Sequence, residues 1–325
     1  MPWLDVCGFL QIGMAVANFT GDGQKKTFDN LFCSPGLTAG LNGHLTFISV
    51  LNSFLSVTAF LGNGLILVAL QKESSLHPPS KLLLRCLATA DLCVGLISKP
   101  VAVTYTMSLV NEHWNICPRL IAASFIISYI LCGVSVGTLA ALSLDRLLAL
   151  LLGLRYRQVV TINRTYVIVF TLWLLPAIFS AMYFWNLLIT YWYGIINIPL
   201  CLIISISSYT KIFFTLRHHQ NRVLAHVQQP NQTNQLNIAR YKMAVSTAIW
   251  LQLTLIACYL PYGIVEALRA KSGLSSCLYR AWIYTATLLY LNSSLNPILY
   301  CWKVAEVRQA VKDTIRQVAF LCFAS

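Results

Sequence analysis

The stretch TYVIVFTLWLLPAIFSAMYFWNLLITYWYGIINIPLCLIISISSYT, from Thr165 to Thr210, contains no Asp, Glu, Lys or Arg. As one α-helix it would be about 69 Å long, whereas the hydrocarbon core of a bilayer is about 30 Å thick. The stretch must therefore divide into two membrane spans. We expect the break near Asn186 to Thr190, which leaves a very short outer loop.

Five more apolar runs of spanning length flank this stretch. They extend from Leu45 to Leu70, from Leu82 to about Leu109, from about Leu120 to Leu152, from about Ile238 to Leu268, and from Leu278 to Trp302. The sequence therefore predicts an all-α membrane protein, a bundle of seven transmembrane helices over residues 45–302. Residues 1–44 would form an extracellular tail, and residues 303–325 a membrane-surface helix and cytoplasmic tail.

The composition supports a membrane protein over a soluble one. Charged residues make up 10% of the chain, against about 25% in soluble domains, and the net charge is +13. The basic residues are not gathered into one patch but lie at the ends of the apolar runs, where they face lipid headgroups, so we expect no nucleic-acid partner. We expect a plasma-membrane protein, and the excess of basic residues on one side predicts that the N-terminus lies outside and the C-terminus in the cytoplasm.

Several polar residues fall inside the predicted spans, where they are costly and usually serve function. They are Asn63, Asp91, Asp145-Arg146, Cys258-x-x-Pro261 and Asn296-Pro297-x-x-Tyr300.

This set resembles the signature positions of rhodopsin-like (class A) G protein-coupled receptors, and Trp173 and Tyr209 fit the same pattern. The resemblance implies a receptor that binds an extracellular ligand and activates a heterotrimeric G protein, with arrestin as a further partner and no enzymatic activity. A short second outer loop without cysteine, and Cys201 where the fifth helix usually has proline, are similar to the cluster of melanocortin, cannabinoid, lysophospholipid and adenosine receptors. The ligand-binding residues of those relatives do not carry over.

Asp91 is the centre of an expected polar network with Ser135, Asn292, Ser293 and Asn296. The resemblance implies an allosteric sodium ion there, and oxygen ligands suit a hard cation. The alternative is a protonated Asp91 in a water-filled network. We expect no other cofactor or metal.

Arg146, at the inner end of the third helix, is the expected activation switch. The carboxylate of Asp145 would hold its guanidinium in the inactive state, and Tyr209 and Tyr300 would steady it in the active state. Further expected switch and coupling residues are Leu154, Arg240, Lys242, Pro261 and Pro297. For the basic residues, ordinary membrane anchoring is the competing explanation.

The chain departs from the family pattern at several positions. Leu147 replaces an aromatic residue, Tyr259 replaces tryptophan, and Ile121 occupies the usual third-helix cysteine position, so the family disulfide is expected to be absent. Two of Cys33, Cys117 and Cys277 could form a substitute bridge, with no basis for choosing the pair.

The ligand pocket is expected in the outer half of the bundle. Its predicted residues are Lys99, Phe125, Ser128, Tyr259, Glu266 and Tyr290. An apolar, aromatic pocket with few polar groups suits a small molecule or a lipid, although a short peptide is also compatible. Glu266 would pair with Lys99, or either would contact the ligand.

The remaining features lie at the two ends of the chain. Asn18 begins an outer glycosylation sequon, and residues from Val304 to Gln317 predict an amphipathic helix on the inner leaflet. Cys322 is either palmitoylated or unmodified. Two other functions remain open: a seven-helix transporter or channel, and a receptor-like protein that does not signal.

Overall fold

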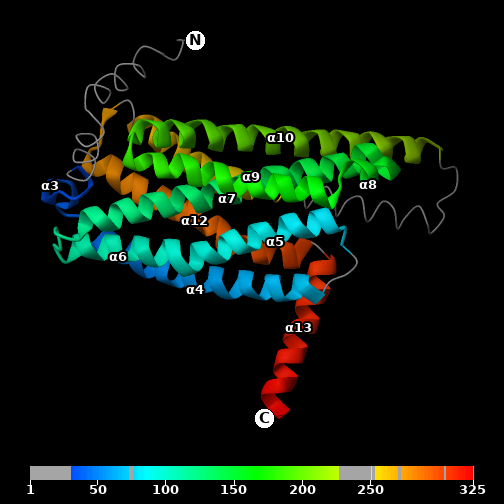
Figure 1. The fold of residues 1–325 in the computed structure, drawn as a ribbon, viewed down its shortest axis with the longest axis horizontal. Helices are drawn as coiled ribbons and strands as arrows, with labels where there is room; N and C mark the ends of the chain where they lie inside the picture. Colours follow the sequence, from blue (N-terminus) through cyan, green and yellow to red (C-terminus); the bar gives the residue numbers. More distant parts are fainter. Residues whose placement is uncertain are drawn as a thin grey trace, which may run out of the picture.

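The computed structural model describes residues 31–72, 76–226, 250, 253–269, 272–303 and 305–324. These residues form helices joined by short turns, with no strand among them, and the long helices run side by side along one axis (Figure 1). Three expected residues, Asn18, Arg240 and Lys242, lie outside the described residues, as does the side chain of Cys322.

Seven helical segments build the bundle, in agreement with the predicted fold. In chain order they are α4 (Asn42–Lys72), α5 with α6 (Pro78–Cys93 and Lys99–Val110), α7 (Cys117–Leu152), α9 (Ile162–Ala181), α10 (Leu187–His226), the helix over 253–269, and α12 (Ser276–Lys303). Five of these segments are long and apolar enough to cross a bilayer by themselves within the described residues. A short helix, α3 (Pro35–Thr38), precedes the first span. The connections contain three more: η2 (Gly153–Arg155), α8 (Tyr156–Val159) and η3 (Met182–Phe184).

The uncharged stretch divides where the sequence predicted. Helix α9 ends at Ala181, η3 follows, and α10 begins at Leu187. The side-chain oxygen of Asn186 accepts a hydrogen bond from the backbone N–H of Leu188 at 3.0 Å. This bond satisfies one of the free donors at the start of α10, which explains why the new helix begins at this residue.

The second span contains a π-helical turn, η1 (Val94–Ser98), that the sequence analysis missed. Pro100 lies just beyond it, lacks a backbone N–H and would collide with the carbonyl one turn earlier in a regular α-helix. The wider π turn relieves that collision and rotates the residues that follow it. An apolar pattern with a period of 3.6 residues cannot reveal such a turn.

Gly95 lies in this π turn because α4 leaves no room for a side chain. A Cβ atom at Gly95 would lie 2.8 Å from the backbone nitrogen of Phe60 and 2.9 Å from the carbonyl oxygen of Ser56. The hydroxyl of Ser56 also donates a hydrogen bond to the carbonyl of Gly95 at 2.5 Å. The first and second spans are therefore in backbone contact at this level.

The amphipathic helix after the last span is α13 (Ala305–Ala324), which contacts α4 as well as α12. Figure 1 shows it running across the long axis of the bundle instead of continuing α12. Val307, Val311 and Thr314 are buried against the bundle, whereas Ile315 is exposed.

Candidate functional site

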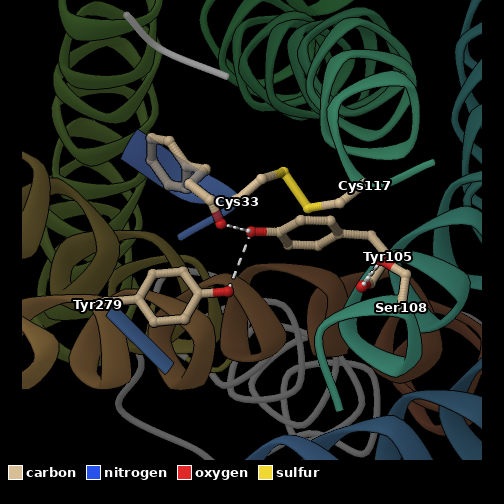
Figure 2. The surroundings of a disulfide bond; sticks show 6 residues. Cys33, Tyr105, Ser108, Cys117 and Tyr279 are labelled. Carbon is tan, nitrogen blue, oxygen red and sulfur yellow. Dashed lines mark hydrogen bonds between the residues drawn. A yellow bond between two sulfur atoms is a disulfide. The ribbon is translucent and has the colours of Figure 1, made fainter. Parts of the chain in front are cut away.

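The segment before α4 folds over one end of the bundle, here named the outer end after the predicted orientation, and is held there by a disulfide between Cys33 and Cys117 (Figure 2). The hydroxyl of Tyr105 donates to the carbonyl of Phe32 at 3.3 Å and lies 3.0 Å from the hydroxyl of Tyr279. Cys277 is free and exposed. The structure thus selects one of the pairings that the sequence left open, and the expected extracellular tail is packed from residue 31 onward.

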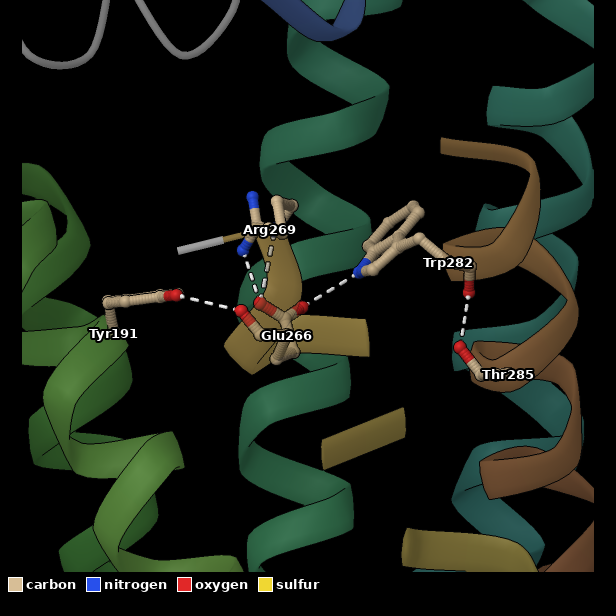
Figure 3. Close-up of polar contacts among 5 residues, drawn as sticks. All are labelled: Tyr191, Glu266, Arg269, Trp282 and Thr285. Carbon is tan, nitrogen blue, oxygen red and sulfur yellow. Dashed lines mark hydrogen bonds and ion pairs between the residues drawn. The ribbon is translucent and has the colours of Figure 1, made fainter. Parts of the chain in front are cut away.

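Glu266 accepts hydrogen bonds from two side chains at the outer end of the helix over 253–269 (Figure 3). Arg269 contacts one carboxylate oxygen through Nε at 3.1 Å and through a terminal nitrogen at 2.5 Å, while Trp282 Nε1 donates to the other oxygen at 2.8 Å. The guanidinium also lies over the rings of Phe32 and Tyr191. The expected pairing of Glu266 with Lys99 was therefore wrong, because Arg269 on the next turn of the same helix is closer.

A cavity of about 100 Å³ lies beneath this outer layer. Phe125, Ser128 and Tyr290 line it, as expected, and the hydroxyls of Ser128 and Tyr290 are hydrogen-bonded to each other. Every described residue in its wall is uncharged. Tyr259 and Glu266 instead line a second, larger and almost entirely apolar cavity of about 380 Å³ between α10 and the helix over 253–269.

Lys99 is fully buried but is absent from the described walls of both cavities. Its ammonium group donates to the hydroxyl of Ser294 on α12 at 3.1 Å. Lys99 follows directly after the π turn, which rotates it relative to a regular helix. Lys99 was predicted to line the ligand pocket, and that prediction was wrong.

The polar network around Asp91 lies deeper in the bundle. Asp91 is fully buried, and one carboxylate oxygen accepts hydrogen bonds from Ser135 at 2.6 Å and Ser293 at 2.8 Å. The other oxygen accepts from Asn296 at 2.7 Å. Asn292 does not donate to the carboxylate, because its buried side-chain nitrogen has no hydrogen-bond partner among the described residues.

The groups around Asp91 offer oxygen ligands for a sodium ion, but a nearby basic side chain opposes its binding. A carboxylate with neighbouring serine hydroxyls and amide groups supplies the oxygen ligands that a hard cation takes. Lys99, however, is a buried basic group that already interacts electrostatically with Asp91. Any bound cation would have to compete with that internal ammonium group.

Asp145, at the inner end of α7, is held by two hydroxyl groups. Ser80 donates to one carboxylate oxygen at 2.7 Å and Tyr156 to the other at 2.6 Å. In the described part of the chain Asp145 makes no ion pair with Arg146, which is exposed. The expected hold of Asp145 on Arg146 is therefore not present in this conformation, because Tyr156 from the following loop occupies the carboxylate.

The other switch residues surround the same inner end. Tyr209 and Tyr300 interact electrostatically with Arg146. The buried hydroxyl of Tyr300 has no hydrogen-bond partner among the described residues. Leu154 is 98% exposed. Pro297 lies inside α12, against Gly62 of α4, where a Cβ would come within 3.0 Å of the proline ring.

Sequence reasoning missed several residues that shape the site. Arg269 could have been found, because its spacing of three residues from Glu266 places both on one helix face. Trp282, Tyr156 and Asn52 carry no comparable signal, since their roles depend on contacts between different helices.

A family model described as 7 transmembrane receptor (rhodopsin family) matches residues 62–190 and 182–300. The chain belongs to the rhodopsin family of seven-transmembrane receptors. The receptor is similar to the adenosine receptor A3 of Canis lupus familiaris, with 24% identity over 300 residues that cover 84% of this chain and 91% of the relative. It is also similar to the adenosine receptors A3 of Ovis aries and Bos taurus, each with 24% identity over 82% of this chain and 88% of the relative.

The family membership agrees with the fold and with the polar residues of the receptor. The expected class A receptor, its multi-pass membrane topology and its non-enzymatic nature are confirmed. Membership of this family implies an extracellular ligand and a G protein as its classes of partner.

Proposed function

We propose that the receptor binds a small, uncharged and largely apolar ligand in the cavity lined by Phe125, Ser128 and Tyr290, and activates a heterotrimeric G protein at the inner end of α7. One observation carries the proposal: α12 contributes a polar side chain at each level between these two places. Tyr290 faces the cavity, Ser293 and Asn296 bind Asp91, and Tyr300 lies near Arg146.

This continuous line of contacts explains how a ligand would bias the receptor. A ligand that binds more tightly to one arrangement of α12 shifts the population toward that arrangement, by no more than its difference in affinity. The shift would be transmitted through Ser293 and Asn296, which both donate to the carboxylate of Asp91. Pro261 and Pro297 weaken the backbone ladders of their helices and favour bending there.

Arg146 is the proposed contact with the G protein. It is exposed, and its neighbour Asp145 is bound to Ser80 and Tyr156 instead. The guanidinium is therefore available to a partner at the cytoplasmic face. Arrestin would use the same face, and the receptor would lie in the plasma membrane with its N-terminus outside.

We further propose that sodium modulates the receptor at Asp91. When bound there, the ion would supply positive charge to the buried carboxylate. Asp91, Ser135 and Ser293 would be its ligands, and their oxygens converge in the structure. Because Lys99 already interacts with Asp91, we expect a weaker sodium effect than the oxygen set alone would produce.

The testing experiment measures G protein dissociation in cells that express the receptor, at rest and with adenosine, other nucleosides, lipids, lysophospholipids and short peptides. Adenosine belongs in the panel because the relatives are adenosine receptors. Arg146→Ala should abolish any response at equal surface expression. Arg164→Ala, an exposed arginine at the inner start of α9, is the matched control and should retain it.

A response that survives in Arg146→Ala would contradict the proposed role of this residue. Silence of the receptor at rest and across the whole panel would contradict the signalling proposal and favour the receptor-like protein that does not signal.

A further inference from the structure

One end of the ligand cavity, between α4, α6 and α12, contains a buried acceptor without a partner. The side chain of Asn52 lies in the cavity wall and is 5% exposed. Its amide nitrogen donates to the carbonyl of Ile48 at 3.1 Å and to the hydroxyl of Thr287 at 3.0 Å. Its oxygen, Oδ1, has no hydrogen-bond partner among the described residues.

The orientation of this amide follows from its neighbours. The carbonyl of Ile48 can only accept a hydrogen bond, so the amide group facing it must be the nitrogen. Thr287 donates its own hydroxyl hydrogen to the carbonyl of Ile283 at 2.9 Å, so its oxygen is left to accept from Asn52. Rotating the amide would place Oδ1 against the carbonyl oxygen of Ile48 and break that bond. The free group is therefore the oxygen, an acceptor.

The polar neighbours of Asn52 at this end of the cavity are already bonded to the protein. The hydroxyl of Thr106 is shared with Ser49 at 2.6 Å and lies within hydrogen-bonding distance of backbone carbonyls of its own helix. A buried water molecule typically makes about three hydrogen bonds, so this end holds a water molecule poorly. An unsatisfied buried acceptor is costly, and a group that satisfies it gains that energy on binding.

We propose that Asn52 Oδ1 is a ligand subsite that recognises one N–H or O–H donor on an uncharged, otherwise apolar ligand. This inference rests on the proposed ligand cavity and specifies its ligand class. A carboxylate or phosphate is disfavoured, because Oδ1 carries partial negative charge and no described residue in the cavity wall is positive. An ammonium ion is disfavoured as well, because the uncharged wall offers no counter-ion to repay its desolvation.

The test uses two probes of the same shape, indole, which has an N–H donor, and benzofuran, which has an oxygen in its place. Binding is measured by ligand-observed NMR to the purified full-length receptor in lipid nanodiscs, with empty nanodiscs to subtract partitioning into lipid. Indole should bind about tenfold more tightly than benzofuran, the discrimination expected for one buried hydrogen bond.

Asn52→Leu, which keeps the side-chain size, should remove this discrimination. Asn52→Leu with Thr287→Val replaces both partners of their bond and serves where the single variant folds poorly. Asn197→Leu makes the same change at another place in the cavity wall, on α10; discrimination that is lost there and kept in Asn52→Leu would place the acceptor at Asn197 and overturn the subsite.

Equal binding of the two probes to the unmodified receptor would overturn the subsite, as would the absence of binding by both or discrimination that survives in Asn52→Leu. The assay contains no G protein, so it separates the subsite from the signalling proposal. Discrimination by a receptor that never activates a G protein would support the subsite and contradict signalling alone.

Discussion

Replacing Arg269 by Met should destabilise the receptor more than replacing Arg269 and Glu266 together. The side chains of Arg269 and Glu266 are only 13% and 9% exposed, so the pair is largely removed from water. Arg269→Met leaves the carboxylate of Glu266 buried with only uncharged donors, Trp282 among them. Breaking a buried pair from one side costs about 3–5 kcal/mol, and the partial exposure here favours about 3 kcal/mol.

The double variant Glu266→Gln with Arg269→Met removes both charges. The amide oxygen of the glutamine can still accept from Trp282, so the expected cost is about 1 kcal/mol, that of an ordinary hydrogen bond. The double variant should therefore be about 2 kcal/mol more stable than Arg269→Met alone.

The assay is thermal unfolding of the purified receptor in nanodiscs at one scan rate, because unfolding of a membrane receptor is commonly irreversible. A difference of about 2 kcal/mol corresponds to about 4–8 °C by the scaling for soluble proteins of 150–250 residues. Arg280→Met, an exposed arginine near the outer end of α12, is the matched control and should change little. A double variant no more stable than Arg269→Met would refute the reasoning, since the unpaired charge would then carry no cost.

Three further predictions concern the deeper parts of the bundle. Gly95→Ala should lower thermal stability by about 1–3 kcal/mol, because the added methyl group would overpack against the backbone of α4, whereas Gly64→Ala, whose new Cβ would lie 3.8 Å from the nearest atom, should be tolerated. Equal unfolding midpoints of the two variants would contradict the close contact at Gly95. Tyr156→Phe should reduce basal nucleotide exchange on the G protein by about tenfold, because the released carboxylate of Asp145 can pair with Arg146. Unchanged or raised exchange would argue against competition between Tyr156 and Arg146 for this carboxylate. Lys99→Met should raise the apparent affinity for sodium by about tenfold, measured as thermal stabilisation in sodium chloride against choline chloride, and Asp91→Asn should abolish the sodium effect. Equal sodium dependence with and without Lys99 would show that its ammonium group does not compete.

The transmembrane spans could be predicted because each depends on a local run of apolar side chains. The division of the uncharged stretch near Asn186 is an example, since length alone required it. The π turn before Lys99 could not be predicted in this way, because a single extra residue in a helical turn leaves the apolar composition unchanged. That one turn is enough to move Lys99 out of the expected pocket.

By itself, the sequence determined the receptor family, the number of helices and the residues that gather around Asp91, because costly polar groups inside lipid mark their positions in each helix. Only the tertiary structure decided which groups meet across different segments: Cys33 with Cys117, Glu266 with Trp282, and Asp145 with Ser80 and Tyr156. These contacts depend on the rotation and depth of one helix relative to another, which arise from packing between distant segments and leave no periodic trace in the chain.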